Sequence, residues 1–294
     1  MQILALFGPT AVGKTGVAIA VAERLRARGE DPVAVNCDSI QVYRGLEVLS
    51  AAPGAEQRKR LEHRLLSFVD PSDEFSAGRY AELAHAEIDS LLAEGRRPIV
   101  VGGTGLYLRA ALADLDLRPP VPTEIREGVE REMAEHGPEA LHAELDEDLA
   151  AGVDSNDRKR IARFTELTRA GIEPARSSAR LWTAELRHPT LLVGLSMPRG
   201  QLGERIDERV DEMVASAAAD EARRAAAAGV SRTARAALGF EELLDGNSRA
   251  MKRAHRQYAR RQLTWMRRME NVTVVDRTAR DDGDVAAEIV GLLD

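Results

Sequence analysis

The segment GPTAVGKT at residues 8–15 constrains the fold more than any other part of this sequence. It fits the pattern G-x-x-x-x-G-K-[ST] and stands between an apolar run at residues 2–7 and an amphipathic stretch that ends near Gly29. A strand, a glycine-rich turn and a helix in this order form a phosphate-binding loop, or P-loop, in which backbone N–H groups and the helix dipole face an anion. We therefore predict a polyphosphate site in which Lys14 supplies a charge and Thr15 binds Mg²⁺ or a phosphate oxygen. The predicted phosphate-binding residues are Gly8, Pro9, Thr10, Ala11, Val12, Gly13, Lys14 and Thr15.

Short apolar runs alternate with helical patterns along the chain. After residues 2–7, buried strands are predicted at 32–36, 98–102, 190–195 and 272–275, and a helix is predicted at about 77–94. Strands that alternate with helices form a parallel sheet with helices on both faces. The predicted fold is thus α/β, a doubly wound parallel sheet like that of P-loop NTPases.

The alternation stops between the strands at 98–102 and 190–195. Pro119, Pro120 and Pro122 interrupt the chain, and residues 123–187 have helical patterns and no strand pattern. We expect a helical insertion domain at 119–187 within a core made of residues 1–118 and 188–294. Two more helical stretches are predicted in that core, at roughly 199–228 and 248–269, and the alanine-rich end of the first fits helix propensity.

Polar residues follow two of the predicted strands, at the edge of the sheet where ligands of open α/β sheets bind. The strand at 32–36 leads into Asp38-Ser39-Ile40-Gln41, and the strand at 98–102 leads into Gly103-Thr104-Gly105. An ATP-hydrolysing P-loop protein is expected to have an aspartate at such a strand end for Mg²⁺ and water, whereas this strand ends in glycine. Asp38 is instead a carboxylate facing the phosphate loop, where it is suited to accept a proton from a nucleophile.

A segment near the C-terminus concentrates positive charge although the whole chain has a net charge of −7. Charge acts locally, within a Debye length of about 8–10 Å, so the total does not exclude a nucleic acid. Residues 249–268 contain no acidic residue, and five of their arginines fall within roughly 60° of helix surface. With no acid within this segment to pair them, they suit a phosphate backbone, while Ala259, Leu263 and Met266 are predicted to face inward. This basic stripe consists of Arg249, Arg253, Arg256, Arg260 and Arg267.

Cysteine content and hydropathy indicate the compartment. The single Cys37 cannot form an internal disulfide, which suits a reducing environment. The N-terminus lacks the pattern of a signal peptide, and no apolar run approaches the roughly 20 residues that span a bilayer. We expect a cytoplasmic protein, a monomer, with no membrane partner.

Four segments together resemble the bacterial tRNA dimethylallyltransferases, in that family's order and nearly from end to end. Supporting segments lie at 69–80, 156–163 and 238–243. The chain departs from the family pattern at Ala52, Arg64 and Phe240, where members often have lysine, a second histidine and tyrosine. The four segments are GPTAVGKT at 8–15, DSIQVYRG at 38–45, GGTGLYLRA at 102–110 and YARRQLTWMRR at 258–268.

The resemblance implies transfer of a dimethylallyl group from dimethylallyl diphosphate to N6 of the adenine next to the anticodon of tRNA, at position 37, with Mg²⁺ as cofactor. It implies that the P-loop binds diphosphate instead of ATP, that Asp38 is the general base, and that Lys14 and Thr104 belong to the catalytic centre. The partner is then the anticodon stem-loop, contacted partly by the helical insertion. The implied tRNA-binding residues, besides the basic stripe, are Asp38, Ser39, Ile40, Gln41, Thr104, Arg126, Lys159, Arg160, Ile161, Ala162 and Arg163.

Three alternatives remain open from the sequence. An adenylate isopentenyltransferase would prenylate free AMP or ATP and would not need the basic stripe. A small-molecule kinase shares the P-loop and an arginine-containing helical lid, but the strand that ends in glycine argues against it. The third is a P-loop protein that binds RNA without catalysis, in which Asp38 would have no chemical role.

Overall fold

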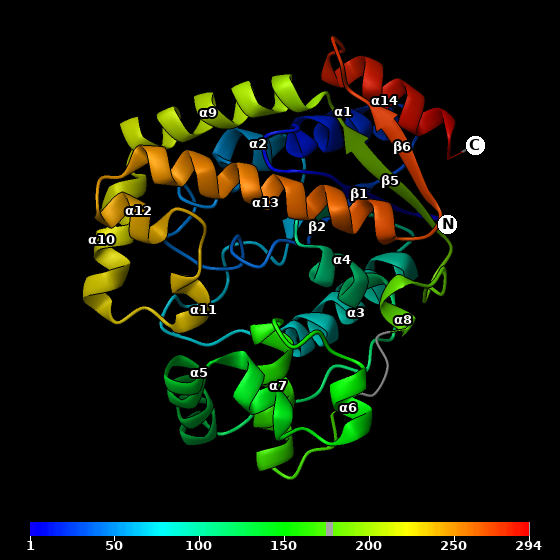
Figure 1. Ribbon diagram of the computed structural model, residues 1–294. Coiled ribbons are helices and arrows are strands. Elements are labelled where there is room, and N and C mark those ends of the chain that lie inside the picture. The colour runs from blue at the N-terminus through cyan, green and yellow to red at the C-terminus, as the bar shows by residue number, and fades with distance from the viewer. Residues whose placement is uncertain (175–178, 294) are drawn as a thin grey trace. The chain divides into compact units, whose positions relative to one another are not determined.

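The computed structural model describes residues 1–174 and 179–293 of the chain. The chain folds into two compact units, of which one joins Met1–Asp114 to Trp182–Asp294 and the other is Leu115–Leu181 (Figure 1). The sequence predicts an insertion at 119–187, and the observed second unit begins and ends several residues earlier.

The first unit is built on a parallel sheet of six strands in the order β3-β2-β4-β1-β5-β6. This order confirms the predicted doubly wound α/β fold, and five of the strands lie where the sequence predicts them. The prediction missed β3, whose two residues pair with Ala34 and Val35 and are too few to form a hydropathy pattern. The strands are β1 (Ile3–Phe7), β2 (Pro32–Asn36), β3 (His63–Arg64), β4 (Arg97–Gly102), β5 (Thr190–Ser196) and β6 (Val272–Asp276).

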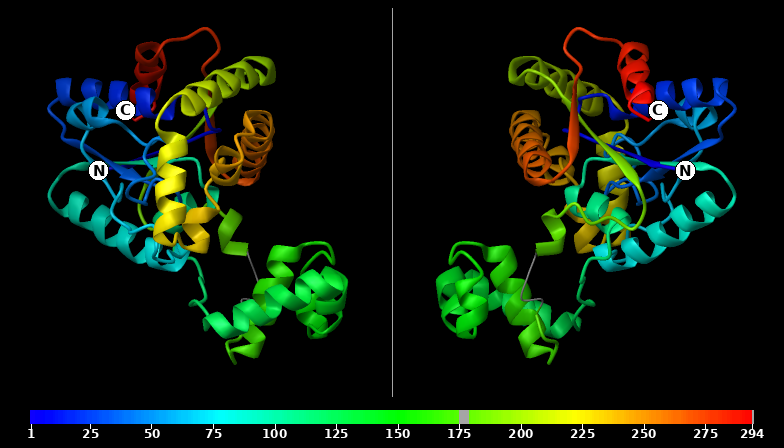
Figure 2. Two further views of the ribbon diagram at one scale, coloured as in Figure 1. Left: turned by 90° about the vertical axis from the view of Figure 1, so that its left-hand side faces the viewer. Right: turned by 90° about the vertical axis from the view of Figure 1, so that its right-hand side faces the viewer.

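Helices cover both faces of the sheet (Figures 1 and 2). On one face α1 (Lys14–Ala27) and α14 (Asp282–Gly291) lie side by side, and their apolar residues share a core with Leu4 and Leu6 of β1 and with the start of α9 (Arg199–Ala215). On the other face α3 (Ala77–Ala93) packs against α4 (Gly105–Leu112) and β4. Alternate residues of the central strands thus point into two separate apolar layers, which is why β1 is apolar and buried at every position.

The long helix α13 (Ser248–Arg268) packs against α9 and α4 and brings Met266 against Gly194 of β5. The helical stretch predicted at 199–228 divides into α9 and α10 (Ala218–Ala228), because Ser216 has an extended backbone with φ −105° and ψ −164°. Shorter helices complete the described part of this unit: α2 (Ala55–Arg60), α11 (Arg232–Arg235) and α12 (Phe240–Leu244), while α8 (Ala179–Trp182) lies at the boundary.

The second unit contains α5 (Thr123–Ala143), α6 (Glu147–Ala151) and α7 (Arg158–Arg169), and no strand among its described residues. Its small core joins Val129 and Met133 of α5 to Ile161 of α7. Helix α5 is kinked at Gly137, whose φ of 80° is left-handed and precedes Pro138. In neither unit does any described helix combine the length and the apolar character needed to cross a membrane.

Two stacked tyrosines in the core differ in hydrogen bonding, so we expect their phenylalanine variants to differ in stability. Tyr80 and Tyr107 have ring centroids 4.2 Å apart, and the Tyr80 hydroxyl donates to the Asn36 carbonyl at 2.9 Å. We expect Tyr80→Phe to lower the free energy of unfolding by about 1–3 kcal/mol, because a buried hydrogen bond is lost. Urea unfolding measures this, with Tyr107→Phe as control, since the Tyr107 hydroxyl has no hydrogen bond to a described residue. Equal losses in both variants would contradict the role of the Tyr80 hydroxyl.

Candidate active site

Residues 8–15 connect β1 to α1 in the conformation of an anion nest. Ala11 and Gly13 have left-handed backbones, with φ of 63° and 91°, and alternating backbone handedness turns successive N–H groups to one side. Gly13 is the N-cap of α1 and has no side chain to occupy the free N–H groups of the first turn. These donors and the helix dipole are therefore available to an anion, as the sequence predicts.

Lys14 lies over this loop. Its Nζ donates to the carbonyls of Gly8 and Pro9, each at 3.0 Å. Desolvation in the packed site, with the Arg209 guanidinium nearby, lowers the pKa of Lys14 to about 8, although Asp38 opposes the shift. Lys14, Asp38 and Arg209 thus act on one another electrostatically, which places the predicted base and two cations around the same loop.

Gly103, just after β4, lies where two side chains converge. A Cβ on Gly103 would overlap the Gln262 amide and would stand 3.4 Å from Lys14 Nζ. Gln262 of α13 donates from Nε2 to the Gly103 carbonyl at 2.7 Å, and its Oε1 accepts from the Thr10 N–H at 2.8 Å. One buried amide therefore joins the P-loop to the residue after β4. Gly103 has no side chain and so leaves room for this amide.

Asp38 is half-buried and held by its own turn. Its Oδ1 accepts from the Ile40 N–H at 3.0 Å, and its own N–H donates to Asn36 Oδ1 at 3.2 Å. Asn36 is buried and is itself fixed by a 3.0 Å hydrogen bond to the Leu65 carbonyl. The second carboxylate oxygen of Asp38 has no hydrogen bond to a described residue, so it can accept a proton from a ligand.

Thr104 joins three elements at the site. Its Oγ1 accepts from the Ser39 N–H at 3.1 Å, and lies 3.3 Å from the Ser39 hydroxyl and 3.5 Å from the Tyr258 hydroxyl. Tyr258 of α13 also donates to the Gly103 carbonyl at 3.3 Å, and burial raises the pKa of Tyr258, which keeps it neutral. Thr104 therefore links the turns after β2 and β4 to helix α13.

Gln41, one of the implied tRNA-binding residues, uses the nitrogen of its side-chain amide to hold the following loop. Its Nε2 donates to the carbonyls of Ser50 at 3.2 Å and Ala51 at 3.3 Å. Its amide oxygen has no hydrogen bond to a described residue, so a contact with a base would use that oxygen.

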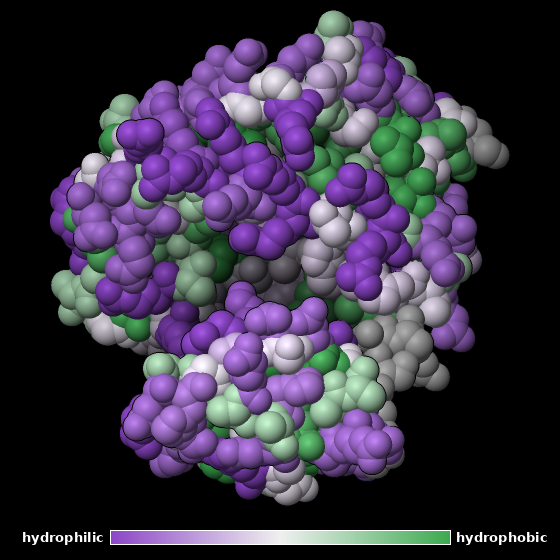
Figure 3. Space-filling model, viewed as in Figure 1, coloured by the Kyte–Doolittle hydropathy of each residue, from purple (hydrophilic) through white to green (hydrophobic). Residues whose placement is uncertain are grey.

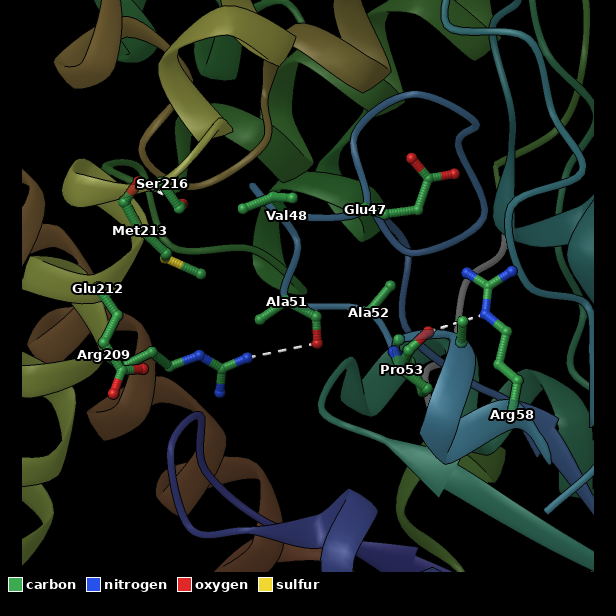
Figure 4. Close-up of a pocket in the computed structure, with 12 residues that line it drawn as sticks. Glu47, Val48, Ala51, Ala52, Pro53, Arg58, Arg209, Glu212, Met213 and Ser216 are labelled. Carbon is green, nitrogen blue, oxygen red and sulfur yellow. Dashed lines mark hydrogen bonds between the residues drawn. The ribbon is translucent and has the colours of Figure 1, made fainter. Parts of the chain in front are cut away.

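Arg209 of α9 is a site residue that the sequence analysis missed. Burial lowers the pKa of Arg209, and Asp38 opposes the shift. Figure 4 shows its side chain at the wall of a cavity of about 570 Å³ between α9 and residues 47–55, with a 3.5 Å hydrogen bond to the Ala51 carbonyl. The available signal is helical spacing, because Arg209 lies three residues after Ile206 and four before Met213, both buried, which places it on the inward side of α9.

The basic stripe of α13 is exposed, and hydrophilic residues cover this helix in the view of Figure 3. The opposite side is buried: Ala259 and Met266 face inward as predicted, while Leu263 is half-buried. The expectation that no acid pairs the stripe is wrong for Arg256, which forms an ion pair with Asp207 of α9. That acid is distant in sequence, so spacing within one helix could not reveal it. The other four members make no ion pair with a described residue: Arg249, Arg253, Arg260 and Arg267, of which Arg267 donates to the Thr264 hydroxyl at 3.2 Å.

The predicted tRNA-binding residues of the second unit differ in exposure. Lys159 and Arg160 are exposed, whereas Arg126 and Ala162 are half-buried. Arg163 binds Glu166 at 3.2 Å and the carbonyls of Arg118 and Pro119, so it holds its own unit together. The prediction that Ile161 binds tRNA is wrong for its side chain. This side chain is fully buried in the apolar core of the second unit and is therefore not accessible to RNA.

Thr15, the predicted Mg²⁺ ligand, is half-buried in the first turn of α1. Among the described residues, no group of three or more His, Cys, Asp or Glu side chains could hold a metal. The Thr15 hydroxyl could therefore bind Mg²⁺ only together with phosphate oxygens of a bound ligand. Such a site is common for Mg²⁺, which keeps several waters and is often held by one or two protein groups plus phosphate oxygens.

Comparisons with known proteins agree with this geometry. A family model described as IPP transferase matches residues 41–269. A tRNA dimethylallyltransferase of Anaeromyxobacter dehalogenans (strain 2CP-C) is 41% identical over 285 residues, which cover 92% of this chain and 94% of that protein. The crystal structure of the full-length tRNA isopentenylpyrophosphate transferase of Bacillus halodurans superposes with a TM-score of 0.72 at 33% identity and covers 99% of this chain and 95% of that one. A eukaryotic dimethylallyltransferase acting on tRNA, at 23% identity and a TM-score of 0.75 over 95% of this chain and 74% of its own, has the same fold.

The lowered pKa of Lys14 predicts proton uptake when inorganic pyrophosphate binds. Near pH 8 about half of the free protein carries this ammonium, and a bound anion favours the charged form. Pyrophosphate affinity should therefore weaken as the pH rises through the pKa of free Lys14, since the charged form is lost. Calorimetry in two buffers of different ionisation enthalpy measures the uptake, with Lys14→Arg as control because a guanidinium does not titrate there. Equal uptake by both proteins would contradict the prediction.

Proposed function

This chain belongs to the IPP transferase family, and we propose that it transfers the dimethylallyl group of dimethylallyl diphosphate to N6 of the adenine at position 37 of tRNA, beside the anticodon. The relatives favour tRNA prenylation over prenylation of free AMP and over a kinase reaction. One observation carries the chemical part of the proposal: Lys14, Arg209 and Asp38 act on one another around a P-loop whose neighbouring strand ends in glycine.

The donor half of the reaction requires charge neutralisation. The bond between the allylic carbon and the diphosphate oxygen breaks, and its electron pair remains on that oxygen. The N–H groups of the P-loop, the Lys14 ammonium and the Arg209 guanidinium stabilise the charge that develops there. Thr15 and the diphosphate oxygens would hold Mg²⁺, which would add further positive charge at the leaving group.

The acceptor half requires a base, because the exocyclic amine of adenine is a poor nucleophile. Its lone pair is delocalised into the ring, so a new bond from N6 to the allylic carbon forms readily only as a proton leaves N6. The free oxygen of Asp38 is suited to take that proton at a hydrogen-bond distance of about 2.6–3.2 Å. The turn that holds Asp38 also carries Ser39 and Gln41, which are proposed to orient the base.

The acceptor must also be docked and its base turned outward. An unpaired loop base costs less to extrude than a base in a duplex. We propose that the exposed arginines of α13, with Lys159 and Arg160 of the second unit, bind the phosphates of the anticodon stem-loop. A monomer in the cytoplasm remains the expected state of the protein.

A transfer assay tests the function directly. The protein is incubated with labelled dimethylallyl diphosphate, Mg²⁺ and either unmodified tRNA or AMP, without ATP, and label is expected in tRNA. Asp38→Asn should slow transfer at least about 100-fold, because the base is removed, while pyrophosphate and tRNA still bind. Label in neither acceptor would refute prenyl transfer, label in AMP alone would favour the free-nucleotide enzyme, and unchanged transfer by Asp38→Asn would remove Asp38 as the base.

Charge reversal on α13 tests the docking surface. We expect the double variant Arg253→Glu, Arg260→Glu to weaken anticodon stem-loop binding at least tenfold, and the slope of log affinity against log salt to become shallower by roughly 2. Both side chains are exposed and free of ion pairs with described residues, so no internal contact is lost. The control Arg223→Glu, Arg224→Glu makes the same charge change on exposed residues of α10. Equal weakening in the two variants would show a general charge effect and would defeat the proposed surface.

A further inference from the structure

Arg277 follows β6 and reaches the P-loop from the C-terminal end of the chain. Its side chain is 8% exposed, and Nη1 donates to the carbonyls of Val12 and Gly13, both at 2.8 Å. Its backbone N–H donates to the Ser196 carbonyl at 3.0 Å, which fixes the residue to the end of β5. Arg277 therefore binds the outer side of the loop whose inner side is the anion nest.

A carboxylate holds the guanidinium in this place. Asp282, the first residue of α14, forms an ion pair with Nη2 of Arg277. Burial lowers the pKa of Arg277, and Asp282 opposes that shift, so the pair keeps the buried cation charged. Helix α14 lies beside α1, so the pair also connects the two helices (Figure 1).

Two glycines make room for this ion pair, Gly13 in the loop and Gly16 in the first turn of α1. A Cβ on Gly13 would overlap the Arg277 guanidinium, and a Cβ on Gly16 would overlap the Asp282 carboxylate. Gly13 also has a left-handed backbone, so it serves both the turn and the close approach of Arg277.

Peptide geometry connects these carbonyls to the anion nest. In a trans peptide the C=O and the following N–H point in opposite directions. Because Arg277 holds the Val12 carbonyl toward itself, the Gly13 N–H points to the opposite side, that of the anion nest. The Gly13 carbonyl, which turns the Lys14 N–H to the same side, is held by Arg277 and also by the Val17 N–H at 3.2 Å.

We propose that Arg277 is a positioning residue for diphosphate binding, and that Asp282 holds Arg277 in place. The inference rests on the proposed function for the identity of the anion. The family model ends at residue 269, so both residues lie beyond the segment that it matches. Arg277 acts through the backbone of the loop and does not touch the anion itself.

Pyrophosphate binding and transfer kinetics test the proposal in the full chain. Arg277→Met should weaken the binding of inorganic pyrophosphate at least tenfold and raise the KM for dimethylallyl diphosphate similarly. Binding of the anticodon stem-loop should stay within twofold, and Arg277→Lys should regain part of the pyrophosphate affinity. The matched control is Arg280→Met, because Arg280 binds Glu288 and the Asp276 and Asp284 carbonyls, and it makes no hydrogen bond or ion pair with residues 8–15.

A merely structural role would give a different result. Arg277→Met would then lower the melting temperature but bind pyrophosphate like the wild type at temperatures where it is folded, and this result would overturn the proposal. If Arg277→Met does not fold, Asp282→Asn replaces it, with an expected weakening of at least threefold, and unchanged affinity would again overturn it. Wild-type protein that binds pyrophosphate but prenylates no tRNA would refute the proposed function while leaving the role of Arg277 intact.

Discussion

The close approach of three chain segments at Gly103 is the constraint on which the rest of the site depends. The Gln262 amide fits against this glycine and holds both the Gly103 carbonyl and the Thr10 N–H, while Lys14 Nζ comes near from the P-loop. Any side chain at this position would displace one of these groups. Gly102 has the same effect one residue earlier, because a Cβ there would overlap the Cys37 backbone and separate the ends of β2 and β4. The distance between the P-loop and Asp38 thus depends on two residues that have no side chains.

Helix α13 contributes to both halves of the proposed reaction. Its exposed face carries the arginines proposed to bind tRNA. On its inward side, the buried Gln262 and the half-buried Tyr258 hold the turns after β1 and β4, and Thr104 connects Tyr258 to the turn after β2. Its ion pairs with α9, from Arg256 to Asp207 and from Lys252 to Asp211, keep the helix against the element that supplies Arg209. The exposed arginines of α13 would therefore serve the proposed tRNA docking, while polar side chains on its inward side fix the geometry of the candidate site.

Local charge, and not the net charge of −7, decides what this site can bind. Two cations, Lys14 and Arg209, surround a loop of inward N–H groups with one carboxylate, Asp38, beside them. Burial lowers the pKa of both cations, and the Arg209 guanidinium lowers the pKa of Lys14 further; a bound diphosphate would oppose these shifts. An aspartate at the end of β4, as in an ATPase, would remove part of this positive potential, so the glycine there serves electrostatics as well as packing.

The sequence by itself determined the elements that depend on local pattern and spacing. It predicted the P-loop, five of the six strands, the helical character of residues 123–169 and the exposed stripe of α13, because hydropathy period and glycine spacing act over a few residues. It also predicted that Asp38 and Thr104 lie at one edge of the sheet, since parallel strands place their carboxyl ends together.

Tertiary structure alone decided that Arg209, Gln262 and Arg277 converge on the P-loop, that Asp207 pairs with Arg256, and that the Ile161 side chain is not accessible to RNA. Gln262 lies more than 250 residues from its partner Thr10, and such contacts leave no local period, so only the packing of helices on the sheet determines them.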